Sequence, residues 1–384
     1  MTLFGIRKQV NPNIPFDNQL LWTVIGLMIF GLIMVTSSSM AFSENDPFFY
    51  TQRELIQIGM SLFLMCITLY IPMQRWQQFG SVLLIISIIM LIVVLGIGSS
   101  INGASRWIPL GVFNFQPAEL SKLSLFLFLA GYLARKSEEV QSGFWGFFKP
   151  MVVMAVLSIL LLKQPDLGTV IVLFMVTIGI LFIAGAQLWQ FIAILLTGVG
   201  AVVCLILYES YRLTRLMTFL DPWQDATGAG YQLVASLMAI GNGGVTGQGI
   251  GNSIFKLRYL PECHTDFIFS IISEEYGYVG VVALLALLFF LTFKALAIGY
   301  RALNQGSQFS GYLACEIGIW FGFQTFVNVG VTSGMLPTKG LTLPFISYGG
   351  SSLIVMSIAV AILLRIDFEF RQQQAQARVR SIKK

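Results

Sequence analysis

The sequence has little charge, few cysteines and a single histidine. Only 11% of its 384 residues are Asp, Glu, Lys or Arg, whereas ordinary globular domains carry about 25%. The four cysteines form no CxxC pair, which argues against a zinc site or a disulfide framework. Residues 1–17 are polar, so we expect no cleavable signal peptide. Hydrophobic residues, in contrast, make up 56% of the chain in long runs, which predicts an integral membrane protein.

Long apolar runs divide the chain into membrane-spanning segments. Crossing the hydrocarbon core takes about 20 apolar residues, and the runs are continuous rather than alternating, which favours helices over a β-barrel. We therefore predict an all-α, polytopic membrane protein with about ten transmembrane helices. The expected ranges are 18–40, 54–73, 78–98, 117–134, 148–163, 167–187, 188–208, 268–298, 309–330 and 351–368.

Lys and Arg near the ends of the spans set the expected orientation. More of them fall on the cytoplasmic side when both termini lie there. This gives a cytoplasmic segment (1–17), a single membrane domain (18–368) with a large extracytoplasmic loop between helices 7 and 8 (209–267), and a basic cytoplasmic tail (369–384). The net charge of +5 is then attributed to topology and lipid headgroups rather than to nucleic-acid binding.

Polar residues gather in the segments expected to face outward. These segments include INGASRWIPLGVFNFQPAELSK (101–122), KQPDLGT (163–169) and GMLPTKGLTLPFISYGGSS (334–352). Their placement at one leaflet indicates a shared cavity or groove. The glycine-rich GQGIG of the large loop follows no strand and faces away from cytoplasmic ATP, so we expect no nucleotide site.

Charged residues within or beside the spans have two interpretations. Glu119 and Lys122 are three residues apart on one helix face, so they could pair with each other or contact a substrate. Glu316 has the same ambiguity, and a structural partner is the favoured interpretation. Lys163 and Asp166 flank Pro165, which should end the fifth span, and a structural role is favoured for them as well.

The stretch LPECHTDFIFSIISEEYG (260–277) holds the only histidine and four carboxylates. Asp266 lies where the large loop meets the eighth span. It could be a helix cap, part of a proton-coupled transport route, or a catalytic group. For His264 an ordinary interfacial role is favoured.

The ordered series INGASRWIPLG, FQPAELSK, QPDLGT, GYQLVASLMAIGNGG, LPECHTDF, EEYG and LPFISYGGSS resembles the SEDS family (shape, elongation, division and sporulation) of bacterial peptidoglycan polymerases. The resemblance extends over nearly the whole chain, and GMLPTKG, with Lys339, is most similar to the family's division members. One departure is Cys263, where the family more often has alanine or arginine. It adjoins the family's aspartate without replacing it.

The resemblance implies a glycosyltransferase of the inner membrane, acting at the division septum and joining lipid II units into β-1,4 glycan strands. The essential aspartate of the family falls on Asp266. The family also works with a class B penicillin-binding protein, the septal transpeptidase, and with other division proteins.

Inverting displacement of a polyprenyl diphosphate requires a base and cations. Asp266 is the candidate general base. The candidate substrate-binding residues are Arg106, Lys256, Arg258, Lys339 and Ser347, because cations on the outer side can bind phosphate oxygens. Candidate supporting residues are Trp107, Glu119, Lys122, Glu262 and Glu275. A divalent cation, Mg or Mn, could assist, although no metal-ligand pattern is present.

Two other functions remain open at this point. A lipid II flippase would use Glu119, Lys122 and Glu316 to line a route across the membrane. A scaffold would only recruit the transpeptidase.

Overall fold

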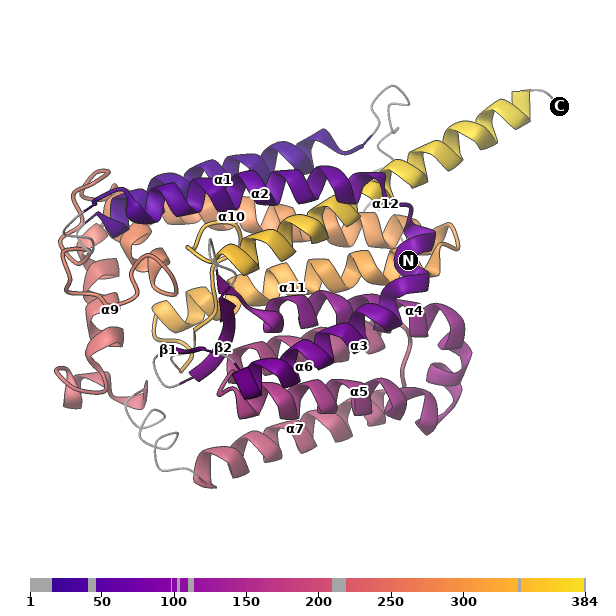
Figure 1. Ribbon diagram of the computed structural model, residues 1–384, viewed down its shortest axis with the longest axis horizontal. Helices are drawn as coiled ribbons and strands as arrows, with labels where there is room; N and C mark the ends of the chain where they lie inside the picture. The colour runs from indigo at the N-terminus through magenta and orange to yellow at the C-terminus, as the bar shows by residue number, and fades with distance from the viewer. Residues whose placement is uncertain are drawn as a thin grey trace.

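The computed structural model describes residues 16–40, 46–97, 99–101, 104–109, 114–208, 219–337 and 340–382. Ten long helices form one bundle (Figure 1). They are α1 (Asn18–Ser39), α2 (Phe49–Tyr70), α3 (Met73–Ile97), α4 (Pro117–Ser142), α5 (Phe144–Lys163), α6 (Leu167–Ile183), α7 (Leu188–Tyr208), α10 (Ile268–Asn304), α11 (Gln308–Thr332) and α12 (Gly350–Ile382).

Each of the ten predicted spans coincides with one of these helices, so the all-α polytopic fold is confirmed. Within the described residues, five helices are long and apolar enough by length and composition alone to cross a membrane: α1, α2, α3, α5 and α10. The largest difference lies at the C-terminal end, where α12 continues to Ile382 through residues expected to form a tail. This extension is rich in Gln, Arg and Ala, which have high helix propensity.

The polarity of α2 is inverted relative to a helix of a water-soluble protein. Its buried positions are Glu54, Gln57, Ser61, Met65 and Thr68, which are mostly polar and recur every three or four residues. Its exposed positions include the apolar side chains of Leu55, Ile56, Leu62, Phe63 and Ile67. A helix with apolar residues outside and polar residues inside is stable when lipid surrounds the bundle.

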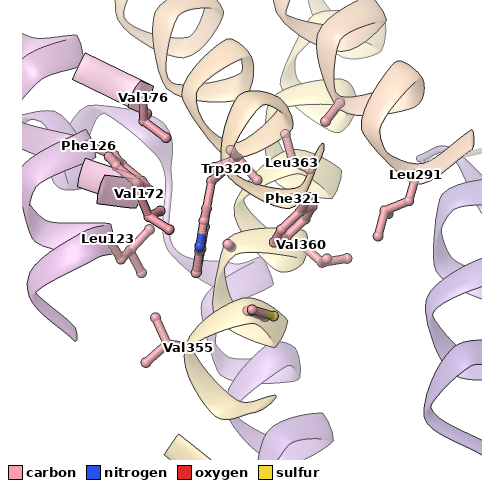
Figure 2. Packing of buried hydrophobic residues seen from close by; sticks show 14 of the residues in the cluster. Leu123, Phe126, Val172, Val176, Leu291, Trp320, Phe321, Val355, Val360 and Leu363 are labelled. Carbon is pink, nitrogen blue, oxygen red and sulfur yellow. The ribbon is translucent and has the colours of Figure 1, made fainter. Parts of the chain in front are cut away.

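The core of the bundle is centred on Trp320 of α11, which is fully buried. Figure 2 shows Trp320 between side chains of α4, α6 and α12, and its ring lies 5.6 Å from that of Phe126 on α4 in an edge-on arrangement. Helix α11 also packs along α10. Helix α12 packs against α2, and α3 packs against α4. Helix α11 therefore lies at the centre, in contact with most of the helices that carry the candidate site.

One end of the bundle carries the extra elements, which the sequence analysis did not predict (Figure 1). We call it the sheet end: α4, α6, α10 and α12 begin there and α5 and α11 end there. Its three-stranded antiparallel sheet consists of β1 (Ser99–Ile101), β2 (Ala104–Pro109) and β3 (Asn114–Phe115). The described part of the large loop contains the 3-10 turn η1 (Pro222–Asp225) and the helix α9 (Tyr231–Gly243). The division into cytoplasmic segment, membrane domain and tail stays a prediction.

Candidate functional site

Asp266 lies at the sheet end, in the turn that leads into α10. The backbone N–H groups of Thr265 and Phe267 both donate to the carbonyl of Glu262, at 3.2 Å. Leu260 and Cys263 are fully buried and anchor the turn in the core, with the Cys263 thiol 3.3 Å from the carbonyl of Ser38. The turn is therefore anchored in the core just before Asp266, and α10 begins just after it, at Ile268.

The Asp266 carboxylate makes no hydrogen bond or ion pair with the part of the chain that the structure describes. It lies against the backbone of Gly340, where an added Cβ would be 2.6 Å from Oδ2. Burial raises the pKa of Asp266 to about 7, the nearby Glu262 and Asp166 carboxylates add to the rise, and Arg106 opposes it. A carboxylate with this pKa is half ionised near neutral pH, which suits a general base.

Arg106, a predicted substrate-binding residue, projects from β2 toward the junction of α5 and α6. Its Nε donates to the carbonyl of Gln164 at 2.9 Å and its Nη2 to that of Pro165 at 2.6 Å. Asp166 caps α6 by accepting bonds from the backbone N–H and hydroxyl of Thr169. Arg106 is thus held in a fixed position with its positive charge partly exposed, and this charge is near enough to Asp266 to lower the pKa of its carboxyl group. Its neighbour Trp107 is partly buried in the same strand.

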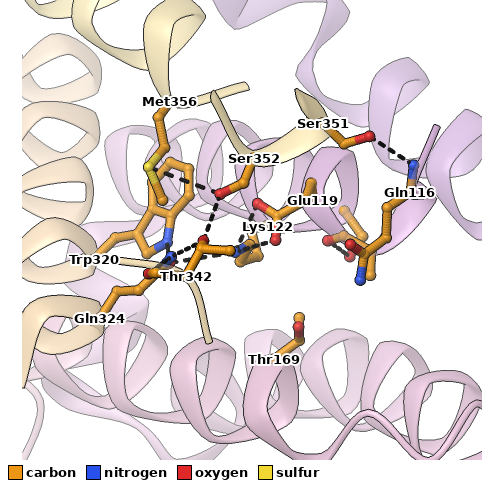
Figure 3. Close-up of polar contacts among 12 residues, drawn as sticks. Gln116, Glu119, Lys122, Thr169, Trp320, Gln324, Thr342, Ser351, Ser352 and Met356 are labelled. Atoms are coloured by element: carbon orange, nitrogen blue, oxygen red, sulfur yellow. Dashed lines mark hydrogen bonds and ion pairs between the residues drawn. The ribbon is translucent and has the colours of Figure 1, made fainter. Parts of the chain in front are cut away.

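Glu119 and Lys122 form a buried ion pair on α4, with both carboxylate oxygens 2.8 Å from Nζ. Figure 3 shows this pair within a polar network. Lys122 also donates to Oε1 of Gln324 at 3.4 Å, and Trp320 donates to the same oxygen at 2.7 Å. The ion pair is thus connected to the loop at Thr342, whose carbonyl and hydroxyl accept from the Gln324 amide.

The expectation that Glu316 has a structural partner is wrong among the described residues. It is fully buried in α11, and neither carboxylate oxygen has a hydrogen-bond partner.

Lys256 and Glu275, assigned to different roles from sequence, form one buried ion pair at 2.8 Å. The Lys256 Nζ also donates to the hydroxyl of Ser37 on α1 at 2.9 Å. The neighbouring Glu274 accepts bonds from the Asn242 amide, the Ser253 hydroxyl and the Ile254 backbone N–H. In this structure Lys256 and both glutamates of EEYG fasten the large loop to the start of α10.

The other predicted site residues lie at different depths. The hydroxyl of Ser347 is buried and accepts the backbone N–H of Leu343 at 2.8 Å, which closes the loop before α12. Glu262 is exposed and accepts from the Thr265 hydroxyl. Arg258 is exposed on the large loop, and Lys339 lies outside the described residues.

In the described parts of the large loop and of the loop before α12, three residues have left-handed backbone conformations although none is glycine. They are Arg258 (φ +69°), Glu262 (φ +54°) and Phe345 (φ +63°). Each such conformation carries a cost in free energy that the surrounding structure has to offset, and such residues cluster at functional sites.

The only histidine, His264, is buried among aromatic rings. Its ring centroid is 4.6 Å from that of Tyr50 and 5.8 Å from that of Tyr348, and burial lowers its pKa. Its carbonyl also accepts the backbone N–H of Tyr348 at 3.0 Å. These contacts fit the structural role favoured from sequence.

Sequence reasoning missed two amides of α11 that lie beside the site, Gln324 and Asn328. Both are buried, and both donate to backbone carbonyls of the loop that follows α11. They are uncharged, so a search for ionisable residues passes over them. An amide inside an otherwise apolar span is the signal that could have found them, because a buried amide requires partners.

The described residues do not fit a metal site held by the protein alone. Among them, no three His, Cys, Asp or Glu side chains lie close enough together to hold a metal ion.

The fold and site define a class of protein: a polytopic membrane protein with an available carboxylate at one end of its helix bundle. Residues 18–372 match the model of the FtsW/RodA/SpoVE family, described as a cell cycle protein, and the chain belongs to this family. The chain is 57% identical over 361 residues to a probable peptidoglycan glycosyltransferase FtsW of Escherichia coli O6:H1 (strain CFT073), covering 93% of this chain and 87% of that protein. It is 54% identical to the protein of the same name from Aliivibrio salmonicida, covering 92% and 89%.

Solved structures share the fold. One is described as "Structural coordination of polymerization and crosslinking by a peptidoglycan synthase complex". It has a TM-score of 0.77 and is 29% identical in sequence, and the match covers 93% of this chain and 99% of the other. The rod shape determining protein RodA of Thermus thermophilus has a TM-score of 0.69 at 29% identity, with coverage of 93% and 98%.

Proposed function

We propose that this protein is a peptidoglycan glycosyltransferase that polymerises lipid II, with Asp266 as general base. The observation that carries the proposal is the state of the Asp266 carboxylate. It is tied in place through its backbone, is partly exposed, lacks an ion-pair partner among the described residues, and has a pKa of about 7. Relatives more than half identical over nearly the whole chain bear the name of this activity.

The chemistry follows from the linkages. In lipid II the sugar is joined to a polyprenol through an α-linked diphosphate, and the product linkage is β-1,4, so the anomeric carbon is inverted. The acceptor's 4-hydroxyl attacks this carbon while Asp266 accepts the hydroxyl proton, and the diphosphate leaves with the bonding electron pair. Arg106, held beside Asp266, offsets the negative charge of the leaving group.

Other cations are assigned less directly. Arg258 and Lys339 stay predicted diphosphate contacts. Lys256 is better suited to holding the loop, because its ammonium is already paired with Glu275. We propose that any divalent cation, Mg or Mn, arrives with the substrate's diphosphate, and activity measured in EDTA tests this. The mechanism contains no nucleotide.

The membrane fold suits a polyprenyl substrate. Extracting the tail into water would cost about 0.8 kcal/mol for each CH₂ group exposed. An enzyme embedded in the bilayer leaves the tail in lipid while the sugar reaches Asp266 at the surface.

We place the protein in the bacterial inner membrane at the division septum, with both termini cytoplasmic and Asp266 facing outward. Its proposed partners are a class B penicillin-binding protein and other division proteins. A transpeptidase partner is supported by the structurally similar peptidoglycan synthase complex, in which polymerization is coordinated with crosslinking.

The alternative function is transport of lipid II. Buried charges within the helices, at Glu119, Lys122 and Glu316, favour keeping it as the second candidate. Purified protein with its transpeptidase partner would be given labelled lipid II in detergent, where transport has no meaning. Long glycan polymer supports the enzyme. Lipid II flipping in vesicles, with no polymer formed in detergent, would support the transporter. If neither polymerisation nor flipping were observed, the scaffold function would be favoured.

A further inference from the structure

Asn328 of α11 contacts both parts of the chain that meet at the candidate base. Its Nδ2 donates to the carbonyl of Asp266 at 2.9 Å and to the carbonyl of Leu341 at 2.6 Å. Leu341 follows Gly340, whose backbone lies against the Asp266 carboxylate. One amide group therefore joins the turn that carries Asp266 to the loop that covers it.

The orientation of the Asn328 side chain is fixed by these two bonds. A flipped amide would place Oδ1 against two carbonyl oxygens, which are acceptors only. Asn328 is buried, and its Oδ1 has no hydrogen-bond partner among the described residues. An unpartnered buried polar atom is costly, so the two bonds made by Nδ2 have to outweigh that cost.

Gln324, one turn earlier on α11, holds the same loop at the next residue. Its Nε2 donates to the carbonyl and hydroxyl of Thr342, at 2.9 and 3.1 Å, while its Oε1 accepts from Lys122 and Trp320 (Figure 3). Gln324 fixes the loop relative to the core of the bundle. Asn328 fixes it relative to Asp266 as well.

We propose that Asn328 is a positioning residue for glycosyl transfer, which sets the distance between the Asp266 carboxylate and the Gly340–Leu341 backbone. The inference rests on the proposed function. A base has to lie within hydrogen-bond reach of the hydroxyl that it deprotonates, and a misplacement of about 1 Å can lower a rate about 100-fold.

The test is the Asn328→Leu variant, which has a similar volume and lacks both donors. We expect the polymerisation rate at saturating lipid II to fall about 10- to 100-fold, with KM changed by less than about twofold. The rate should also reach its half-maximum at a lower pH than in the wild type. The reason is that a loosened loop admits more water to the partly exposed Asp266, and greater hydration lowers the pKa of a carboxyl group.

The groups facing Asp266 are Glu262 from its own turn, Arg106 from β2 and Asp166 from the start of α6, and none of them is altered. Thr325→Val is the matched control. It removes a buried hydrogen bond to the Phe321 carbonyl on the same helix and should keep the wild-type rate and pH midpoint. All rates are normalised to the yield of folded protein, and melting temperatures in detergent show whether each variant is as stable as the wild type.

A wild-type rate and midpoint per folded Asn328→Leu molecule would overturn the proposal. A lower rate with an unchanged pH midpoint would also overturn the proposal. A residue with only a structural role lowers the amount of active protein but does not change the pH at which the rate is half-maximal. If the leucine variant does not fold, Asn328→Ser, which keeps one donor, should show the same shifts at smaller size. Full activity of Asp266→Asn would instead refute the proposed function, whatever Asn328 does.

Discussion

The two ends of the helix bundle both contain paired carboxylates, and they differ in one residue, Asp266, at the sheet end. At the end opposite the sheet, Asp17, Glu139, Asp367 and Glu369 each lie in an ion pair with Lys or Arg. At the sheet end Glu119 and Glu275 are also paired, but Asp266 has no such partner in the described chain. A hydrogen bond from Lys149 lowers the pKa of Glu139, while burial raises that of Asp266 to about 7. A paired carboxylate joins helices, whereas an unpaired one with a raised pKa is available to accept a proton.

The largest expected effect is that of removing the available carboxylate. Asp266→Asn keeps the size of the side chain and removes the base, so polymerisation should fall about 10²- to 10⁴-fold. Glu139→Gln at the opposite end should retain the wild-type rate. Both are measured as labelled glycan formed from lipid II in detergent. Equal losses in the two variants would contradict the distinction between the ends.

The second prediction compares a buried pair with an exposed one. Lys122→Met leaves Glu119 buried and unpaired, which should lower the free energy of unfolding by about 3–5 kcal/mol. Lys149→Met breaks a pair that is largely exposed and should leave the melting temperature unchanged, because exposed pairs contribute little. Thermal unfolding in detergent measures both. Adding Glu119→Gln to Lys122→Met should restore part of the loss, and a Lys122→Met protein as stable as the wild type would refute the importance of this pair.

The third prediction concerns the contact between Asp266 and Gly340. A Cβ at Gly340 would displace the carboxylate, so Gly340→Ala should lower the polymerisation rate about tenfold with little change in stability. Gly26→Ala is the control, since its Cβ would meet nothing within 4 Å. If both variants retain wild-type rates, the position of Gly340 does not matter for the reaction.

The smallest expected effect is that of the charge on Glu262. The negative charge of this carboxylate is the second-largest cause of the raised pKa of Asp266; burial is the largest. Glu262→Gln should therefore shift the half-maximal rate slightly to lower pH and leave the maximal rate nearly unchanged, and salt should reduce the shift because Glu262 is exposed. A shift to higher pH would contradict this arrangement of charges.

The sequence was enough to predict the helices, because long apolar runs are what a bilayer requires. It also placed Asp266 at the start of α10, since apolar residues begin at Phe267. The strands of residues 99–115 and the helix α9 were missed because short elements leave a weak pattern. The pairing of Lys256 with Glu275 was also missed, because it depends on how the large loop folds back onto α10. Asn328 was missed because its role depends on hydrogen bonds to two backbone carbonyls, those of Asp266 and Leu341, which are distant from it in the sequence.

The most direct test of the central claim is the pH dependence of polymerisation by the wild-type protein. A base acts in its ionised form, and the pKa of Asp266 is about 7. The rate should therefore be constant above about pH 8, reach half its maximum near pH 7, and fall about tenfold for each further unit of acidity. A rate that stays constant down to pH 5, with the protein still folded, would show that Asp266 does not act as the base.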